Sequence, residues 1–181
     1  EEPFKGSEPI TIDWDAGEDV SGVDDVTLEY RVEGGSWETI ASGLGDAGST
    51  DWSPEGTSSE SVQVRATATD RVGNSASDST EEFTVDSQAP TVNSITPSSA
   101  APTYTQSGED IEVSWDASDQ TTGVEDVTVS IVDDGTTVDQ KTGLEGTGSA
   151  IFTAPSTEGN YSIVVEATDS VGNTRTTSKS D

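Results

Sequence analysis

Hydrophobic and polar residues alternate along most of this chain. A period of two leaves one face of each segment for burial, which predicts β-strands. No stretch shows the 3.6-residue period of a capped amphipathic helix, so the pattern predicts an all-β protein. The alternating apolar positions are Ile10, Ile12 and Trp14; Val26, Leu28, Tyr30 and Val32; Val62, Val64, Ala66 and Ala68; Phe83 and Val85; Ile111, Val113 and Trp115; Val127, Val129 and Ile131; and Tyr161, Ile163, Val165 and Ala167.

The alternation occurs twice, because the chain contains an internal repeat. A shift of 101 positions places residues 10–30 over residues 111–131 without a gap, so that Trp14 meets Trp115. The heptapeptides ATDRVGN (68–74) and ATDSVGN (167–173) follow, 99 positions apart. Turn sequences such as EGGS at 33–36 and DDGT at 133–136 separate the apolar runs. Short strands with such spacing are typical of antiparallel sandwiches.

The segment between the two copies, residues 86–97, contains Pro90, which is incompatible with a helix and favours an extended approach to a strand at about Thr91 to Ile95. We therefore place a domain boundary near Gln88, with one domain at 1–87 and a second at 88–181.

The net charge of the chain limits the classes of partner that it can bind. Asp and Glu number 36 against 7 Lys and Arg, and the net charge is -29. Nucleic acid and anionic membrane surfaces would be repelled. Acidic residues spread along a whole chain suit a protein that lives in molar salt, where self-repulsion is screened, and they also suit cation binding. Both interpretations remain open.

Several classes of chemistry are disfavoured by composition. The chain has no cysteine and no histidine, which removes disulfides, thiol catalysis and the commonest general base. No apolar run reaches the length of a membrane helix, so no direct membrane insertion is expected in this segment. No nucleophile lies beside a base in the sequence, and we expect no enzyme activity. The start at Glu1, without Met or signal sequence, indicates a processed or excised piece.

Three stretches carry a family resemblance: WDASD at 115–119, GNYSIVVEATDSVGN at 159–173 and FTVDSQAP at 83–90. They resemble the immunoglobulin-like repeats of large bacterial and archaeal cell-surface proteins, and the acidity is similar to that of haloarchaeal examples. The resemblance implies two tandem Ig-like Greek-key β-sandwich domains, with the tryptophan strand as strand B and the ATD strand as strand F.

The same resemblance implies an extracellular, cell-surface location and a non-catalytic structural or adhesive role. Such a module would act as a rigid spacer in an S-layer, stalk or filament adapted to high salt. Its partners would be neighbouring copies or domains of the same surface protein. The alternative is an accessory module of a secreted hydrolase that binds a glycan, for which Trp37 and Trp52 are the candidate stacking residues. Trp14 and Trp115, in contrast, occupy core-facing positions.

Both ends of the chain depart from the repeat. Trp115 follows Pro90 by 25 residues, whereas Trp14 follows Glu1 by only 13. The counterparts of Phe83 and Val85 would be positions 182 and 184, beyond Asp181. We therefore expect an N-terminally incomplete first domain and a C-terminally incomplete second domain. The chain would then be a piece of a longer array, or neighbouring molecules would supply the missing strands.

The repeated heptapeptide has two interpretations. In the first, Asp70 is the opening residue of a type I turn and Gly73 adopts a positive φ, so that the motif closes the hairpin between strands F and G.

The second interpretation is an interdomain Ca²⁺ site. The Ig-like topology brings the exit of the first copy to the B–C and F–G loops of the second, where oxygen ligands gather. The candidate ligands are Asp86, Asp116, Asp119, Asp169 and Asn173, with Asp86, Asp119 and Asp169 foremost; Asp15, Asp19 and Asp70 would form a degenerate equivalent in the first copy. Separately, Asn160 begins a glycosylation sequon, Asn160-Tyr161-Ser162.

Overall fold

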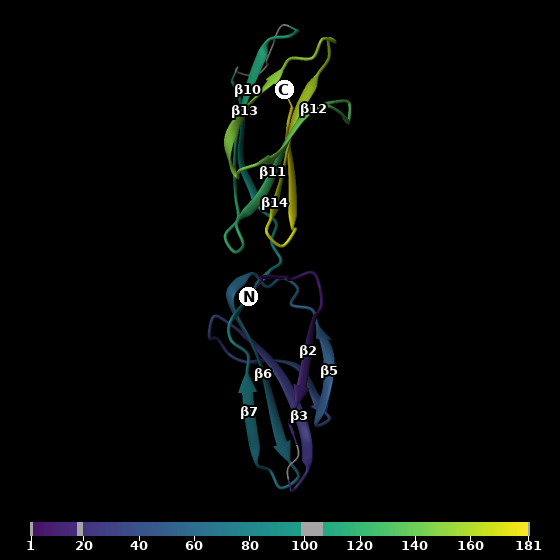
Figure 1. The fold of residues 1–181 in the computed structure, drawn as a ribbon, viewed down its shortest axis with the longest axis vertical. Coiled ribbons are helices and arrows are strands. Elements are labelled where there is room, and N and C mark those ends of the chain that lie inside the picture. The colour runs from purple at the N-terminus through teal and green to yellow at the C-terminus, as the bar shows by residue number, and fades with distance from the viewer. Residues whose placement is uncertain (1, 18–19, 99–106, 181) are drawn as a thin grey trace. The chain divides into compact units, whose positions relative to one another are not determined.

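The computed structural model describes residues 2–17, 20–98 and 107–180. The chain forms two compact units, Glu1–Ser87 (unit 1) and Gln88–Asp181 (unit 2), and each is described by itself (Figure 1). The described residues contain fifteen strands and no helix, as the alternating pattern predicts.

Unit 1 is a sandwich of a large and a small sheet. The large sheet has the strand order β1-β8-β6-β3-β4, with β7 also paired to β6, and the small sheet is the pair β2-β5. All pairs are antiparallel except β1 with β8. The strands are β1 (Phe4–Lys5), β2 (Ile10–Asp15), β3 (Val23–Val32), β4 (Glu38–Leu44), β5 (Ala47–Trp52), β6 (Ser59–Asp70), β7 (Ser75–Ser79) and β8 (Phe83–Asp86).

Unit 2 is a sandwich of three and four strands, in the orders β13-β10-β9 and β12-β11-β14-β15. Lettered from β9, these orders are E-B-A and C′-C-F-G, the Ig-like Greek-key arrangement that the resemblance implies. β10 carries Trp115 as strand B, and β14 carries the ATD motif as strand F. The strands are β9 (Thr91–Pro97), β10 (Asp110–Ser118), β11 (Val124–Asp133), β12 (Thr136–Leu144), β13 (Thr147–Thr153), β14 (Tyr161–Asp169) and β15 (Thr174–Lys179).

The buried residues are those of the alternating pattern. In β10 the burial alternates from Val113 to Trp115 to Ala117, all of which face the core. The core of unit 2 is Ile95, Val113, Trp115, Ala117, Val127, Val129, Ile131, Phe152, Val165 and Ala167. The core cluster of unit 1 is smaller and consists of Trp52, Val62, Val64, Phe83 and Val85. Unit 1 also fills its β1–β8 end with an edge-to-face contact between Phe4 and Phe83, whose ring centres lie 5.5 Å apart.

The hairpin turn between β11 and β12 has the conformation that its residues favour. β11 and β12 are joined by Asp134 and Gly135, whose φ angles are 43° and 81°. Positive φ at both central positions defines the two-residue hairpin turn whose twist matches that of the strands. Only glycine, asparagine and aspartate tolerate this conformation readily, which is why the DDGT sequence marks the turn.

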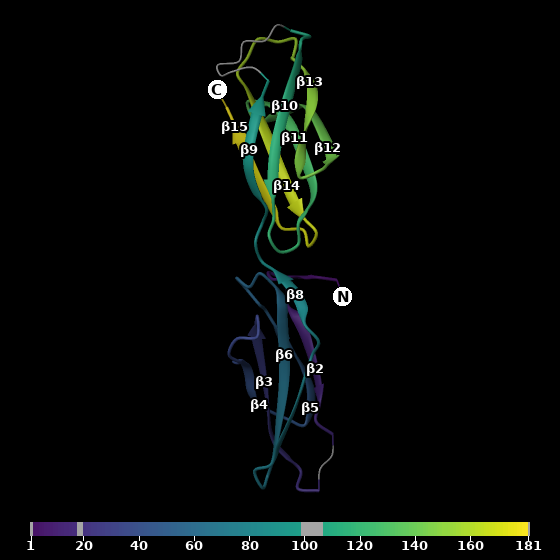
Figure 2. The ribbon, with the colours of Figure 1, turned by 90° about the vertical axis from the view of Figure 1, so that its left-hand side faces the viewer.

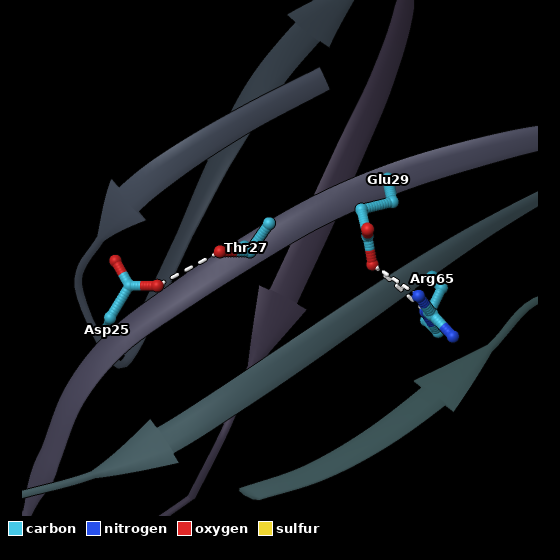
Figure 3. A network of polar contacts seen from close by, with 4 residues as sticks. All are labelled: Asp25, Thr27, Glu29 and Arg65. Carbon is cyan, nitrogen blue, oxygen red and sulfur yellow. Dashed lines mark hydrogen bonds and ion pairs between the residues drawn. The ribbon is translucent and has the colours of Figure 1, made fainter. Parts of the chain in front are cut away.

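On the outer face of the large sheet of unit 1, β3 and β6 share an ion pair. Arg65 donates from Nε and Nη2 to the same oxygen of Glu29, at 3.1 and 2.6 Å, and Thr27 Oγ1 donates to Asp25 Oδ2 on β3 (Figure 3). Glu29 and Arg65 are direct partners in the register of the two strands. The guanidinium groups of Arg31 and Arg65 also lie 4.6 and 4.2 Å from the ring centre of Trp37.

Candidate metal centre

Asp169 organises the hairpin that joins β14 to β15. Its Oδ1 accepts the backbone N–H groups of Val171 and Asn173, at 3.0 and 2.8 Å, and its Oδ2 accepts Asn173 Nδ2 at 2.8 Å. The N–H of Gly172, whose φ is 82°, donates to the carbonyl of Asp169. The carboxylate is fully buried, so these bonds fix its orientation.

The first heptapeptide folds in the same way. Asp70 Oδ1 accepts the N–H groups of Val72 and Asn74, and Oδ2 accepts Asn74 Nδ2. Gly73 has a φ of 90° and donates its N–H to the Asp70 carbonyl. The turn prediction for Asp70 and Gly73 is therefore confirmed, and the same bonds recur in the second copy.

These bonds also change the acidity of Asp70. The side-chain hydrogen bond from Asn74 is the main cause that lowers the pKa of Asp70 to about 2, with help from the N–H groups of Asn74 and Val72 and from Ser21 Oγ. Each of these donors favours the charged form of the carboxylate. Ser21, which lies 49 positions from Asp70 and donates at 2.8 Å, was not singled out by the sequence. The signal that could have found Ser21 is its position next to Gly22, which aligns with Gly123 in the B–C loop of the second copy.

Asp119 holds the loop between β10 and β11. Its Oδ1 accepts three consecutive backbone N–H groups, from Thr121, Thr122 and Gly123, at 3.0, 2.9 and 3.2 Å. Gly123 has a φ of 74°, a left-handed conformation that glycine adopts without steric cost. The aspartate thus shapes its own loop, as the heptapeptide aspartates shape theirs.

Strand register brings Asp119 and Asp169 together within unit 2. Val124, the first residue after the loop of Asp119, pairs with Asp169 across β11 and β14. One carboxylate oxygen of Asp119 lies within 4.8 Å of one of Asp169. Two oxygens on opposite sides of one Ca²⁺, each at about 2.4 Å, are separated by about the same distance.

The other two candidates in unit 2 have different surroundings. Asp116 accepts Thr147 Oγ1 at 2.7 Å and Asn93 Nδ2 at 3.1 Å, across β13 and β9. Because neighbours along a strand face opposite sides, and Trp115 faces the core, Asp116 lies on the outer face of its sheet. Among the described residues, Asp116 is not part of the group of closely spaced carboxylates that contains Asp119 and Asp169. Asn173 is buried, and its amide nitrogen is directed to Asp169.

The described candidates in unit 1 are Asp15, Asp70 and Asp86, and each is the last residue of a strand. Asp86 is the last residue of β8, is fully buried, and accepts the N–H of Gly6 at its carbonyl, at 2.8 Å. Asp15 ends β2, and its Oδ1 accepts the N–H of Gly17 at 2.9 Å. Asp19 lies outside the described residues.

Both tryptophans proposed for sugar stacking contact other side chains of unit 1. Trp52 is 9% exposed, belongs to the core of unit 1 and packs on Tyr30 at 4.8 Å. The ring of Trp37 is approached by the two guanidinium groups of Arg31 and Arg65. The Trp52 ring is therefore not an open platform for a sugar, whereas sugar stacking on the half-buried Trp37 stays a prediction. Asn160 is exposed and directly precedes β14, so its side chain is accessible.

Comparisons with known proteins give no family assignment. No protein-family model matches the chain, and no curated protein matches it. Solved structures do match. A 1.5-MDa bacterial ice-binding adhesin is 16% identical with a TM-score of 0.48, over 99% of this chain and 59% of that one. A Ca²⁺-stabilized adhesin with which an Antarctic bacterium binds ice is 19% identical with a TM-score of 0.45, over 99% and 45%.

A third match comes from an animal protein. The FN1–FN3 domains of chicken CNTN1 are 15% identical with a TM-score of 0.40, over 98% of this chain and 61% of that one. The chain thus spans between 45% and 61% of the length of these three structures. The assignment of the Ig-like fold rests on the strand order and register of this chain itself. No helix among the described residues has the length and apolarity needed to cross a membrane.

Proposed function

We propose that this chain is a non-catalytic structural module of an extracellular surface protein, in which tandem sandwiches serve as a spacer. The observation that carries the proposal is the duplication itself, with two Ig-like units joined by only Ser87, Gln88, Ala89 and Pro90 between β8 and β9. A linker this short, with a proline, restricts the number of arrangements of the two units. Its partners are neighbouring domains or copies of the same protein.

The proposal includes Ca²⁺ at the junction, bound by Asp86, Asp119 and Asp169. Within unit 2, Thr91 of β9 pairs with Ser118, the residue before Asp119. Asp86 is five residues before Thr91, and an extended chain spans about 3.5 Å per residue, so a tether of at most about 18 Å connects them. A cation shared across this tether would link the last strand of unit 1 to the loops of unit 2. It would also offset repulsion among acidic residues.

Calcium titration calorimetry on residues 1–181 tests the metal site. We expect saturable binding below about 1 mM Ca²⁺, weakened at least about tenfold by Asp119→Asn and by Asp169→Asn. Asparagine preserves the shape of the side chain and an acceptor for the turn while it removes the charge. Asp139→Asn in β12 is the control, because Asp139 is exposed in the same unit and belongs to neither set of candidate ligands. No binding at millimolar Ca²⁺, or an equal loss in the control, would contradict the site.

A distance measurement tests the spacer role independently of affinity. The chain has no cysteine, so Thr39→Cys in β4 and Thr137→Cys in β12, both exposed, accept one spin label each. Pulsed electron paramagnetic resonance then gives the distribution of distances between the units. We expect a narrow distribution with Ca²⁺ and a broader one with a chelator. A broad distribution under both conditions would rule out a rigid spacer.

The adaptation to high salt and a place in an S-layer, stalk or filament belong to the same proposal. A net charge of -29 is strongly self-repelling until salt screens it. We expect the melting temperature, followed by circular dichroism, to rise between about 0.1 M and about 3 M KCl, where the Debye length falls from about 10 Å to about 3 Å or less. An unchanged melting temperature would remove the physical basis for the high-salt role. Glycosylation at Asn160 would be detected by mass spectrometry of the native protein.

A further inference from the structure

Unit 1 contains an apolar groove that opens between its two sheets. The cavity has a volume of about 500 Å³ and lies between β2 and β7. Its accessible floor is formed by core-facing residues of β6, among them the half-buried Ala66 and Ala68. Ile12 and Trp14 of β2 form one wall, and residues 76–80 form the other. No charged side chain lies on the floor, whereas Asp13, Asp15 and Asp78 lie at the walls.

In unit 2, the same place is filled by a strand. β9 pairs with β10, the counterpart of β2, and packs against β14 and β15, the counterparts of β6 and β7 (Figure 2). It buries Ile95, which is 8% exposed and lies opposite Trp115 in the register. β15 also contacts β9 through a hydrogen bond, which Lys179 Nζ donates to the carbonyl of Ile95 at 3.1 Å.

Residues that line this place are more exposed in unit 1 than their equivalents in unit 2. Trp115 is 3% exposed, but its equivalent Trp14 is only half-buried. Ala117 is buried, and its equivalent Ala16 is exposed. Val113 and Ala167 of unit 2 are fully buried, whereas their equivalents in unit 1, Ile12 and Ala68, are only half-buried.

The backbone of β2 is also available along this side. β10 pairs with β13 on one edge and with β9 on the other, whereas β2 pairs only with β5 among the described residues. An edge strand presents N–H and C=O groups at the spacing that another strand requires. The groove therefore combines a hydrogen-bonding edge with an apolar slot, the two elements of recognition by strand addition.

We propose that this groove is a strand-acceptor site, and that its occupant is a separate extended segment of the β9 type that adds antiparallel to β2. The occupant carries no acidic residue, because the three aspartates at the walls of the groove would repel it, and it presents one branched aliphatic side chain opposite Trp14, as Ile95 does opposite Trp115. The segment 88–98, QAPTVNSITPS, has this chemistry and contains no charged residue. The inference rests on the comparison of the two units and does not depend on Ca²⁺ or on the spacer role.

Peptide binding to the complete chain, residues 1–181, tests the proposal. A synthetic peptide with the sequence 88–98 is added, and binding is followed by the fluorescence of the chain and by backbone amide NMR shifts. We expect saturable binding, with shifts confined to β2, β6 and β7 of unit 1. A peptide with the change Ile95→Asp is expected to bind at least about tenfold more weakly, because a charge would enter the apolar slot.

A blocking variant locates the site. Ala76 pairs with Ala68, and both line the groove, so Ala76→Trp would fill it from an exposed strand. Ser75→Trp is the matched control, because its side chain lies on the opposite face of the same strand. We expect the affinity to fall at least about tenfold in the first variant and less than about twofold in the second. A melting temperature equal to that of the wild type shows that the fold of each variant is intact.

Three outcomes would overturn the proposal. The first is the absence of saturable binding of the 88–98 peptide up to about 1 mM. The second is a set of shifts that maps to β9 and β10, which would mean that the peptide displaces the resident strand of unit 2. The third is equal binding of the wild-type and Ile95→Asp peptides, which would indicate non-specific association.

Discussion

The two units differ around their aligned tryptophans, although the two sequences align there without a gap. β2 and β10 carry the aligned tryptophans, and both indole groups donate from Nε1 to a backbone carbonyl, of Gly45 at 3.0 Å and of Glu145 at 2.9 Å. Of these two strands, only β10 has a partner strand on both edges among the described residues. The burial of a core residue is therefore set by the neighbour of its strand as well as by its own alternation.

The largest test of this comparison is removal of the tryptophans. Truncation of a buried tryptophan costs about 3–5 kcal/mol, and we expect Trp115→Ala to lower the free energy of unfolding of unit 2 by about 4 kcal/mol. Trp14→Ala should cost unit 1 about half as much, since part of its ring already contacts solvent. Native-state hydrogen exchange of amides in β10 and β2 measures each unit separately. Equal losses would show that the groove does not expose Trp14 in solution.

Two equivalent glycines provide a second test. A Cβ at Gly148 would lie 3.0 Å from Trp115, and one at Gly48 would lie 2.8 Å from Trp14. We expect Gly148→Ala to destabilise unit 2 by about 1–3 kcal/mol, because the enclosed ring cannot move. Gly48→Ala should cost less than about 1 kcal/mol, because the groove gives the ring of Trp14 room to shift. Thermal denaturation of both variants measures the difference, and a larger loss for Gly48→Ala would reverse the comparison.

A smaller effect concerns pH and unit 1. The pKa of Asp70 is about 2 in the folded chain, below its ordinary value of 3.8. Its ionised form therefore stabilises the fold at pH values above about 4, and this contribution is lost as the pH falls towards 2. We expect the melting temperature of unit 1 to fall over this range, and Asp70→Asn to remove that part of the fall. The difference between wild type and variant isolates Asp70 from the other carboxylates, and parallel curves would contradict its role.

The smallest expected effect comes from the ion pair of unit 1. Glu29 and Arg65 occupy the register position at which unit 2 has Ser130 opposite Val164 (Figure 3). Ion pairs near the surface contribute about 1 kcal/mol or less. We therefore expect the double variant Glu29→Ser with Arg65→Val to change the free energy of unfolding by less than about 1 kcal/mol. Urea denaturation measures it, and a larger loss would mean that the contact of Arg65 with Trp37 stabilises unit 1.

Much of the fold could be predicted from the sequence because two independent signals agree. Alternation identified β2, β3, β6 and their counterparts, and the repeat at 101 and 99 positions identified the duplication. β7 and β12 could not be found in this way, because nearly all of their residues are exposed and show no apolar face. The parallel pairing of β1 with β8 depends on contacts across the unit, such as that between Phe4 and Phe83, and no local pattern encodes it.

The candidate metal centre could be predicted only in part. Asp119 and Asp169 are brought together by the pairing of β11 with β14, which the Ig-like topology implies. Asp116 precedes Asp119 by three residues, yet it lies on a strand and faces outward towards Asn93 and Thr147. The strict alternation with Trp115 already contained that information. The participation of Asp86 stays a prediction, for which the calcium titration is the test.

The turn aspartates have a consequence for how such a chain acquires its structure. All of the bonds that Asp70 makes to Val72 and Asn74 lie within five consecutive residues, as do those of Asp169 to Val171 and Asn173. Contacts this local close in microseconds and require little loop entropy. We expect each hairpin to nucleate its own repeat during synthesis, before the next repeat leaves the ribosome. Two neighbouring repeats of related sequence would then have little opportunity to exchange strands and misfold.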